Sequence, residues 1–141
     1  MGKWKSSLEI MVMVNKQFWE GKKVLITGHT GFKGSWLVSW LYMLGAKVTG
    51  ISLDPTEKYY HYKYLKNKIK IKDIRLDIRN ENKLKNQILK IQPDFVFHLA
   101  AQSIVSTSYL KPKYTFETNV VGSFNLLNSL NKLKKNVLLL W

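Results

Sequence analysis

Three regularly spaced glycines are the first feature of this sequence that could do chemistry. The run Thr27-Gly28-His29-Thr30-Gly31-Phe32-Lys33-Gly34 places a glycine at every third position. Residues 24–27 form a short apolar stretch typical of a buried strand, and an amphipathic helix is predicted over residues 32–44. Glycines at such a junction permit a tight turn, close approach of a pyrophosphate and close packing of helix on sheet. The spacing therefore predicts a dinucleotide phosphate site on the free N–H groups of that helix.

The order of residues within this loop excludes a mononucleotide P-loop. A P-loop ends in Gly-Lys-Ser/Thr, whereas this chain has Lys33-Gly34-Ser35. The spacing also differs from the Gly-x-Gly-x-x-Gly of most dehydrogenases, and ordinary turn glycines are the alternative. The strand before and the helix after the loop argue against that alternative. Lys33 adds a cation that can neutralise a phosphate.

Two acidic residues follow the next predicted strands. Asp54 lies 20 residues after Gly34, near the distance at which a carboxylate reaches the adenosine ribose hydroxyls. A carboxylate there favours NAD over NADP, although Lys33 leaves that choice open, and a simple turn with Pro55 is the alternative. Asp77, followed by Ile78, is predicted to face the adenine, with a helix N-cap or strand-end role as the alternative.

Small residues follow the fourth predicted strand. The stretch Leu99-Ala100-Ala101-Gln102 leaves room for a ligand at the switch point of a parallel sheet. His98, inside the apolar strand itself, is interpreted as a core histidine rather than a catalyst.

The elements that position these residues alternate between strand and helix. Strands are predicted at 24–27, 46–53, 69–76, 94–99 and from 136, and helices at 32–44, 80–91 and 113–133. The Tyr- and Lys-rich segment 55–68 is predicted to be a loop or irregular. The order predicts an α/β fold, a doubly wound parallel sheet with strand order 3-2-1-4-5. The apolar faces expected for the first and third helices consist of Phe32, Trp36, Leu37, Trp40, Leu41 and Leu44, and of Phe116, Val120, Phe124, Leu127 and Leu130.

Length and composition limit the class of protein. The 141 residues carry a net charge of +14 and no cysteine. One domain is expected over residues 21–141, after a leader at residues 1–20. No apolar stretch is long enough for a membrane span, no thiolate metal site is possible and no metal site is predicted. A cytoplasmic protein with no membrane partner is the expectation.

The positive charge raises the alternative of a basic nucleic-acid-binding domain. The chain has 21 lysines spread along its length but only two arginines, Arg75 and Arg79. Arginine is the preferred residue for bidentate phosphate and base recognition. Lys, Asn and Ile together account for 41 residues, as expected of an AT-rich genome. Compositional bias therefore explains the charge better, and no nucleic-acid partner is expected.

The sequence resembles the extended short-chain dehydrogenase/reductases, specifically the CDP-glucose 4,6-dehydratases. The resemblance rests on four stretches: 18–37, which contains the glycine loop; DIRN at 77–80; QPDFVFHLAAQ at 92–102; and 108–127. It implies tightly bound NAD and conversion of the nucleotide sugar CDP-glucose to CDP-4-keto-6-deoxyglucose, in a usually homo-oligomeric enzyme. The positions implied for the pyrophosphate are Gly28, Thr30, Gly31, Phe32 and Gly34. Those implied elsewhere are Asp77 and Ile78 for adenine, Leu99 to Gln102 near the nicotinamide ribose, and Asn119 as a tether.

The same resemblance predicts that the catalytic groups lie elsewhere. The family's Ser/Thr, carboxylate pair and Tyr-x-x-x-Lys follow the fifth strand. The Tyr-x-x-x-Lys pairs of this chain start at Tyr59, Tyr62, Tyr64 and Tyr109, after the second or fourth strand. The chain is thus interpreted as the cofactor half of a dehydratase, truncated near the fifth strand and without a substrate domain or turnover of its own. A non-catalytic dinucleotide-binding remnant is the alternative.

Overall fold

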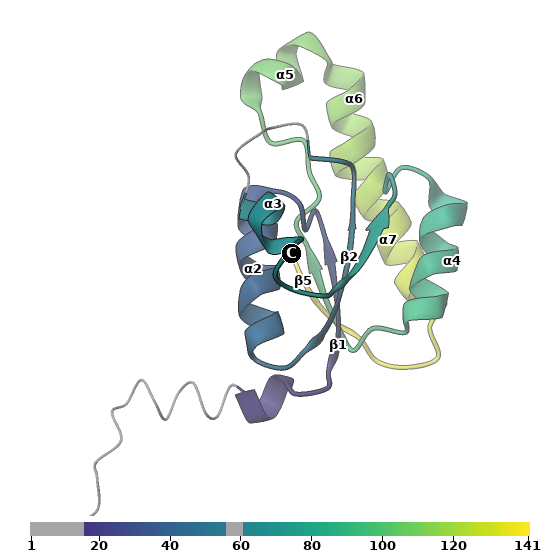
Figure 1. Ribbon diagram of the computed structural model, residues 1–141. Helices are drawn as coiled ribbons and strands as arrows, with labels where there is room; N and C mark the ends of the chain where they lie inside the picture. Colours follow the sequence, from purple (N-terminus) through teal and green to yellow (C-terminus); the bar gives the residue numbers. More distant parts are fainter. Residues whose placement is uncertain (1–15, 56–60) are drawn as a thin grey trace, which may run out of the picture.

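Five parallel strands form one sheet in the computed structural model, which describes residues 16–55 and 61–141. Their order is β3-β2-β1-β4-β5, so the doubly wound topology predicted from the sequence is confirmed (Figure 1). The order reverses between β1 and β4, where ligands bind in open sheets of this kind. The strands are β1 (Lys23–Thr27), β2 (Lys47–Ser52), β3 (Lys72–Arg75), β4 (Phe95–His98) and β5 (Leu138–Leu140).

Helices cover both faces of the sheet. One face carries α2 (Phe32–Met43) and the short α3 (His61–Leu65), and the other carries α4 (Glu81–Ile91) and α7 (Gly122–Leu130) (Figure 1). The shorter helices α5 (Val105–Leu110) and α6 (Pro112–Phe116) lie at one end of the molecule. The chain runs from α6 through a π-helical turn, η1 (Glu117–Val121), directly into α7.

The two faces bury separate apolar clusters. Leu25 packs with Ile51, Leu84 and Ile88 on the side of α4, while its neighbour Val24 packs on the side of α2. Successive residues of a strand point to opposite faces, so a strand covered on both sides has to be apolar throughout. This requirement explains the continuous apolar run that identified β1 in the sequence.

The elements between the strands differ in detail from the prediction. The helix predicted over 113–133 is continuous from Pro112 to Leu130 but contains the π-helical turn, and α5 precedes it unpredicted. Part of the segment predicted as a loop at 55–68 folds into α3. The third strand begins at Lys72, because Ile69 and Ile71 pack against the α2 cluster before pairing starts.

The apolar faces predicted for α2 and for the 113–133 helix are correct only in part: Leu41 and Leu44 are buried and Leu37 and Leu130 pack against the core, but the aromatic residues do not face it. In α2 the buried residues are Gly34, Ser35, Val38 and Leu41, while Phe32, Trp36 and Trp40 are exposed. In α7 the buried residues include Gly122, Ser123, Asn125 and Ser129, while Phe116 and Phe124 are exposed. Small side chains face the sheet because they let the helix axis approach it closely.

The described part of the predicted leader packs on the sheet. Residues 16–19 are helical, and the Trp19 ring lies 4.8 Å from the Phe95 ring, centroid to centroid. Residues 1–15 lie outside the described residues, so the leader boundary stays a prediction. Within the described residues, no helix combines the length and the apolar character needed to cross a membrane.

Candidate functional site

A pocket opens at the carboxyl ends of the four strands β1 to β4. It gathers nine of the residues that the sequence predicted for a dinucleotide site, from four separate loops: Gly28, Thr30, Gly31, Asp54, Asp77, Ile78, Leu99, Ala100 and Ala101. The positions around the switch point of the sheet are thus brought together in space. The contact of each residue with a cofactor stays a prediction.

The glycine loop has the geometry that the spacing required. Gly28 adopts a left-handed backbone with φ +74°, and a Cβ there would lie 2.6 Å from the Leu99 carbonyl carbon. A Cβ on Gly34 would collide with the Gly28 carbonyl oxygen, so Gly34 lets α2 begin close against the loop. Glycine is needed at both positions, for backbone conformation and for space respectively.

The start of α2 leaves its amide groups without a side-chain cap. Its N-cap residue, Gly31, offers no side chain, and its first turn carries no acidic residue. By contrast, α4 is capped by the Asn80 side chain, which accepts a hydrogen bond from the Lys83 N–H, and Glu81 lies in its first turn. The first N–H groups of α2 are the kind of donors that bind a phosphate.

Five predicted residues lie outside the pocket lining. Phe32 and Lys33 are exposed at the start of α2, and Gly34 is buried beneath the loop. Gln102 and Asn119 instead pair with each other. The Gln102 N–H donates to Asn119 Oδ1 at 2.7 Å, and Asn119 Nδ2 donates to the Gln102 carbonyl at 2.9 Å. Asn119 therefore ties η1 to the loop after β4, and its role in a cofactor site stays a prediction.

The two predicted carboxylates have different surroundings. Asp54 is largely exposed and lies 3.4 Å from Nε of Arg75. Both oxygens of Asp77 accept hydrogen bonds from the Arg79 guanidinium, which hold the pKa of Asp77 below its ordinary value. The backbone N–H of Arg79 also donates to Asp77 Oδ1, at 2.9 Å, so Arg79 engages both oxygens of a carboxylate that has about four lone-pair sites. The N-cap of α4 is Asn80, so Asp77 does not take the alternative role of helix cap.

Sequence reasoning missed six residues of the pocket lining. They are Ser52, Leu53, Pro55, Leu76, Tyr114 and Thr118. Thr118 is the most informative, because its hydroxyl is buried and has no hydrogen-bond partner among the described residues. It lies in the π-helical turn, and such turns often occur at functional sites. The sequence carried no readable signal for that turn.

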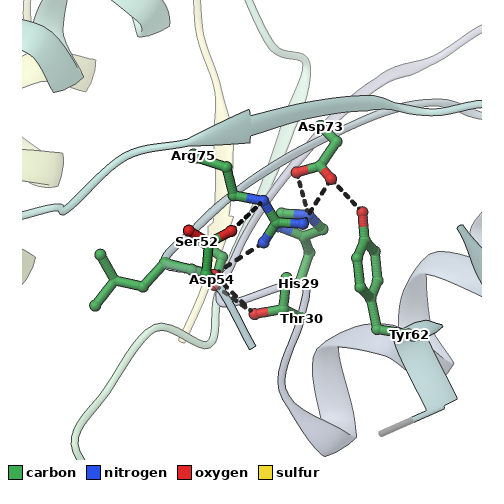
Figure 2. Close-up of polar contacts among 8 residues, drawn as sticks. His29, Thr30, Ser52, Asp54, Tyr62, Asp73 and Arg75 are labelled. Atoms are coloured by element: carbon green, nitrogen blue, oxygen red, sulfur yellow. Dashed lines mark hydrogen bonds and ion pairs between the residues drawn. The ribbon is translucent and has the colours of Figure 1, made fainter. Parts of the chain in front are cut away.

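A polar network lies behind the glycine loop (Figure 2). His29 is fully buried, and its Nε2 hydrogen bonds to Asp73 Oδ1 of β3 at 3.0 Å. The Tyr62 hydroxyl of α3 donates to the other oxygen of Asp73. Thr30 Oγ1 joins the same loop directly to the end of β2 through Ser52 Oγ at 2.7 Å. The loop is thereby fixed against β2, β3 and α3.

Burial controls the protonation of this network. Burial lowers the pKa of His29 below its ordinary value and outweighs the opposite effect of Asp73. Burial also raises the pKa of Asp73, but the hydrogen bonds from Tyr62 and His29 and the charge of Arg75 outweigh it and keep that pKa low. Burial and the bond to Asp73 raise the pKa of Tyr62 well above its ordinary range. The resting network is a neutral imidazole, an ionised carboxylate and a neutral phenol.

The structure agrees with the interpretation of His98 as a core histidine. It is buried, and its ring nitrogens hydrogen bond to Thr27 Oγ1 at 2.6 Å and Ser123 Oγ at 2.8 Å. Burial lowers its pKa. Both ring nitrogens are occupied, which leaves none to accept a proton from a substrate.

None of the described Tyr-x-x-x-Lys pairs has the features of a catalytic pair. The Tyr62 phenol is committed to Asp73, and its raised pKa makes it a poor base at neutral pH. Tyr64 and Tyr109 are exposed and do not line the pocket. The fourth pair begins at Tyr59, which lies outside the described residues.

Both arginines are engaged inside the molecule. Arg75 pairs with Asp73 at 2.7 Å and approaches Asp54, whereas Arg79 pairs with Asp77 at 2.5 Å and with Glu117 at 3.5 Å. Guanidinium groups held in this way are not presented for nucleic-acid phosphates. This arrangement disfavours the basic nucleic-acid-binding alternative.

The fold and the pocket together define a dinucleotide-binding protein of the Rossmann type. Residues 25–140 match the model of the GDP-mannose 4,6 dehydratase family, and the chain belongs to that family. Its relatives include nucleotide-sugar dehydratases and epimerases.

Three similar proteins illustrate the relationship. CDP-glucose 4,6-dehydratase of Salmonella typhimurium is 42% identical over 120 residues, which cover 85% of this chain and 33% of that protein. An epimerase structure from Methanothermobacter thermautotrophicus has a TM-score of 0.74 at 28% identity, covering 88% of this chain and 36% of that one. UDP-glucose 4-epimerase of Thermus thermophilus, solved as a complex with NAD, has a TM-score of 0.67 at 32% identity, with coverage of 77% and 33%. The chain thus spans about a third of the length of these relatives.

Proposed function

We propose that this chain binds NAD in the pocket at the carboxyl ends of β1 to β4. The buried hydroxyl of Thr118 is the observation that carries the proposal, because it belongs to a residue of the pocket lining and has no hydrogen-bond partner among the described residues. A buried hydroxyl left without a hydrogen bond is costly, so a polar ligand group is the natural partner. The uncapped amides of α2 across the pocket supply a second requirement of a dinucleotide, a phosphate site.

The surrounding residues suggest how the cofactor lies. The pyrophosphate would sit on the N–H groups that follow Gly31, with the adenosine ribose towards Asp54 and the adenine towards Asp77 and Ile78. The small residues Ala100 and Ala101 leave room for the nicotinamide end. The NAD complex of the Thermus thermophilus relative supports the choice of cofactor.

We further propose that this cofactor portion serves the dehydration of CDP-glucose. The 42% identity to the Salmonella typhimurium CDP-glucose 4,6-dehydratase supports this substrate. Bound NAD would accept a hydride from the sugar and return it. The chain's own contribution is to hold and orient the dinucleotide through the glycine loop, Asp54, Asp77 and Thr118. A homo-oligomeric assembly and a cytoplasmic location stay predictions.

Titration calorimetry of the 141-residue chain with NAD tests the binding proposal. We expect saturable binding of one NAD per chain. Absence of heat at millimolar NAD, with material shown to be folded by circular dichroism, would overturn the proposal.

A second assay tests whether these 141 residues turn over CDP-glucose on their own. The described residues hold no catalytic Tyr-x-x-x-Lys pair, so we expect no keto-sugar from CDP-glucose and NAD with these 141 residues alone. Keto-sugar in that assay would show that the catalytic groups lie within this chain. A Tyr-x-x-x-Lys encoded in another frame of the DNA beyond codon 141 would indicate an interrupted dehydratase gene.

A further inference from the structure

Arg75 contacts both Asp73 of the polar network and Asp54 of the pocket lining (Figure 2). Its side chain comes from the last residue of β3 and reaches across to the end of β2. Nη1 donates to the Leu53 carbonyl at 2.9 Å, Nη2 donates to Asp73 Oδ2 at 2.7 Å, and Nε lies 3.4 Å from Asp54 Oδ1. The guanidinium therefore bridges two carboxylates beside the place where Asp54 is predicted to meet the ribose.

The position of the Arg75 guanidinium is fixed by the groups around it. Asp73 also accepts from Tyr62 and His29, and the guanidinium carbon lies 5.3 Å from the centroid of the Tyr62 ring. Two of its three nitrogens are held by the Leu53 carbonyl and by Asp73. The third nitrogen, Nε, faces Asp54, whose side chain is 86% exposed.

The charges at this end of the pocket favour a ribose without a phosphate. The Arg75 guanidinium carries one positive charge and the carboxylates of Asp54 and Asp73 carry two negative charges. The three side chains together therefore carry one net negative charge. A 2′-phosphate would bring about two more negative charges next to Asp54 and would be repelled. The neutral diol of NAD, in contrast, can donate hydrogen bonds to the carboxylate.

Without the Asp54 charge, Arg75 and Asp73 together carry no net charge. The guanidinium would then keep its anchors at Leu53 and Asp73, with Nε turned towards the ribose position. Arginine binds phosphate oxygens well because its donors form a rigid planar fork. Arg75, which now forms an ion pair with Asp54, would thus become the group that binds a 2′-phosphate.

The preference for NAD that a carboxylate at Asp54 confers is expected of this fold, and we propose that Arg75 is a further determinant of the choice between NAD and NADP, acting through its ion pair with Asp54. Asp54 excludes the 2′-phosphate and occupies Arg75, and loss of Asp54 exposes Arg75 as a 2′-phosphate site. The proposal rests on the proposed function, since it concerns the ribose end of the same cofactor pocket.

The test is calorimetric titration of NAD and NADP into the full chain and its variants. The wild-type chain should bind NAD and bind NADP at least about tenfold more weakly. Asp54→Asn should raise NADP affinity by about tenfold to a hundredfold, the effect of gaining a charged hydrogen bond in place of a repulsion. The double variant Asp54→Asn/Arg75→Gln should lose that gain.

Lys72→Gln supplies a matched control in the Asp54→Asn background. Lys72 lies on the same strand but three residues earlier, so its side chain points to the opposite face of the sheet from Arg75. Removal of this charge should leave the NADP gain intact. Arg75→Lys keeps the charge without the fork and should retain only part of the gain, which keeps the test valid if Arg75→Gln destabilises the fold.

The outcomes separate the two proposals. If wild-type chain binds neither dinucleotide, the proposed function fails and this inference with it. If NAD binds but Asp54→Asn gains no NADP affinity, or gains it equally without Arg75, the inference alone is overturned. An equal loss of the gain with Lys72→Gln would also overturn it, because general charge rather than Arg75 would then be responsible.

Discussion

The hydroxyl of Thr118 offers the most direct residue-scale test of the pocket. Thr118→Val keeps the shape of the side chain and removes its polar group. We expect NAD affinity to fall about fivefold to tenfold, as for loss of one hydrogen bond. The melting temperature of the free protein should stay the same or rise, because the variant removes a buried hydroxyl that has no partner among the described residues.

A fall in NAD affinity without a fall in the melting temperature distinguishes a ligand contact from a structural contact. Thr107→Val makes the same chemical change on α5, whose residues do not line the pocket, and should leave NAD affinity unchanged. Calorimetry and thermal melts measure both quantities. Unchanged affinity in Thr118→Val would mean that the hydroxyl does not face the cofactor.

Two buried histidines predict loss of stability in mild acid. Burial lowers the pKa of His98 and His29 in the folded chain, whereas in the unfolded chain both titrate near their ordinary value of 6.5. Below that value the unfolded state binds more protons, so the stability is fully present above about pH 6.5 and falls as pH drops towards the folded pKa values. Each histidine contributes a slope of up to about 1.4 kcal/mol per pH unit.

Melting temperatures between about pH 7.5 and pH 5.5 measure this slope. The chain has three histidines, which allows a matched comparison. His98→Gln should make the dependence shallower, whereas His61→Gln should not, because His61 is only partly buried and stacks on Trp36. A slope that is the same in all three proteins would contradict the assignment of His98 as a neutral core residue.

At the scale of the elements, the glycine turn after β1 should tolerate no side chain. Gly28 and Gly21 share the same backbone angle, φ +74°, but a Cβ on Gly21 would meet no atom within 4 Å. Gly21→Ala should cost about 1–2 kcal/mol, the penalty of a left-handed L-residue. Gly28→Ala should cost about 1–3 kcal/mol more, because the Leu99 and Ala100 backbone must move.

Chemical denaturation of the two variants measures the difference directly. Since both substitutions carry the same conformational strain, the difference reports the close approach between the β1 and β4 loops. Equal destabilisation of the two proteins would show that the close approach does not constrain the turn.

The elements themselves were predictable because their signals are local or simply periodic. The apolar runs of β1 and β4 and the amphipathic pattern of α4 depend on nearest neighbours, and the glycine triplet marks the crossing between strand and helix. Strand order followed from these, since right-handed crossovers leave few alternatives. The positions of Gly28, Asp54, Asp77 and Ala100 around one pocket are consequences of that order.

The helix faces were not predictable by the same reasoning. The expectation that Trp36 and Trp40 face the core assumed that the largest apolar residues are the most buried. In α2, Ser35 and Val38 are buried instead, and the aromatic side chains are exposed. Close helix-to-sheet approach selects small residues, and a hydrophobic pattern alone does not reveal this. The π-helical turn that contains Thr118 likewise left no pattern in the sequence; it ends directly before Gly122, which packs closely against Ile78.

At the scale of the whole molecule, the charge of +14 should act in opposite directions on folding and on binding. Like charges spread over the surface repel one another in the compact state, while a positive field attracts an anionic dinucleotide. Raising NaCl from about 20 mM to about 300 mM shortens the Debye length from roughly 20 Å to below 10 Å. We therefore expect the melting temperature to rise by a few degrees and NAD affinity to fall severalfold.

A variant of lower net charge tests whether repulsion among the lysines causes the effect of salt on the melting temperature. Lys132 and Lys134 are exposed and lie between α7 and β5, away from the pocket lining. The double change Lys132→Glu/Lys134→Glu lowers the net charge by four, and should raise the low-salt melting temperature and reduce its further rise with salt. NAD affinity at low salt should fall only slightly, since the pocket itself is unchanged. A melting temperature that falls with salt in the wild-type chain would mean that the ion pairs at Asp73, Asp77 and Asp94 outweigh the repulsion among lysines.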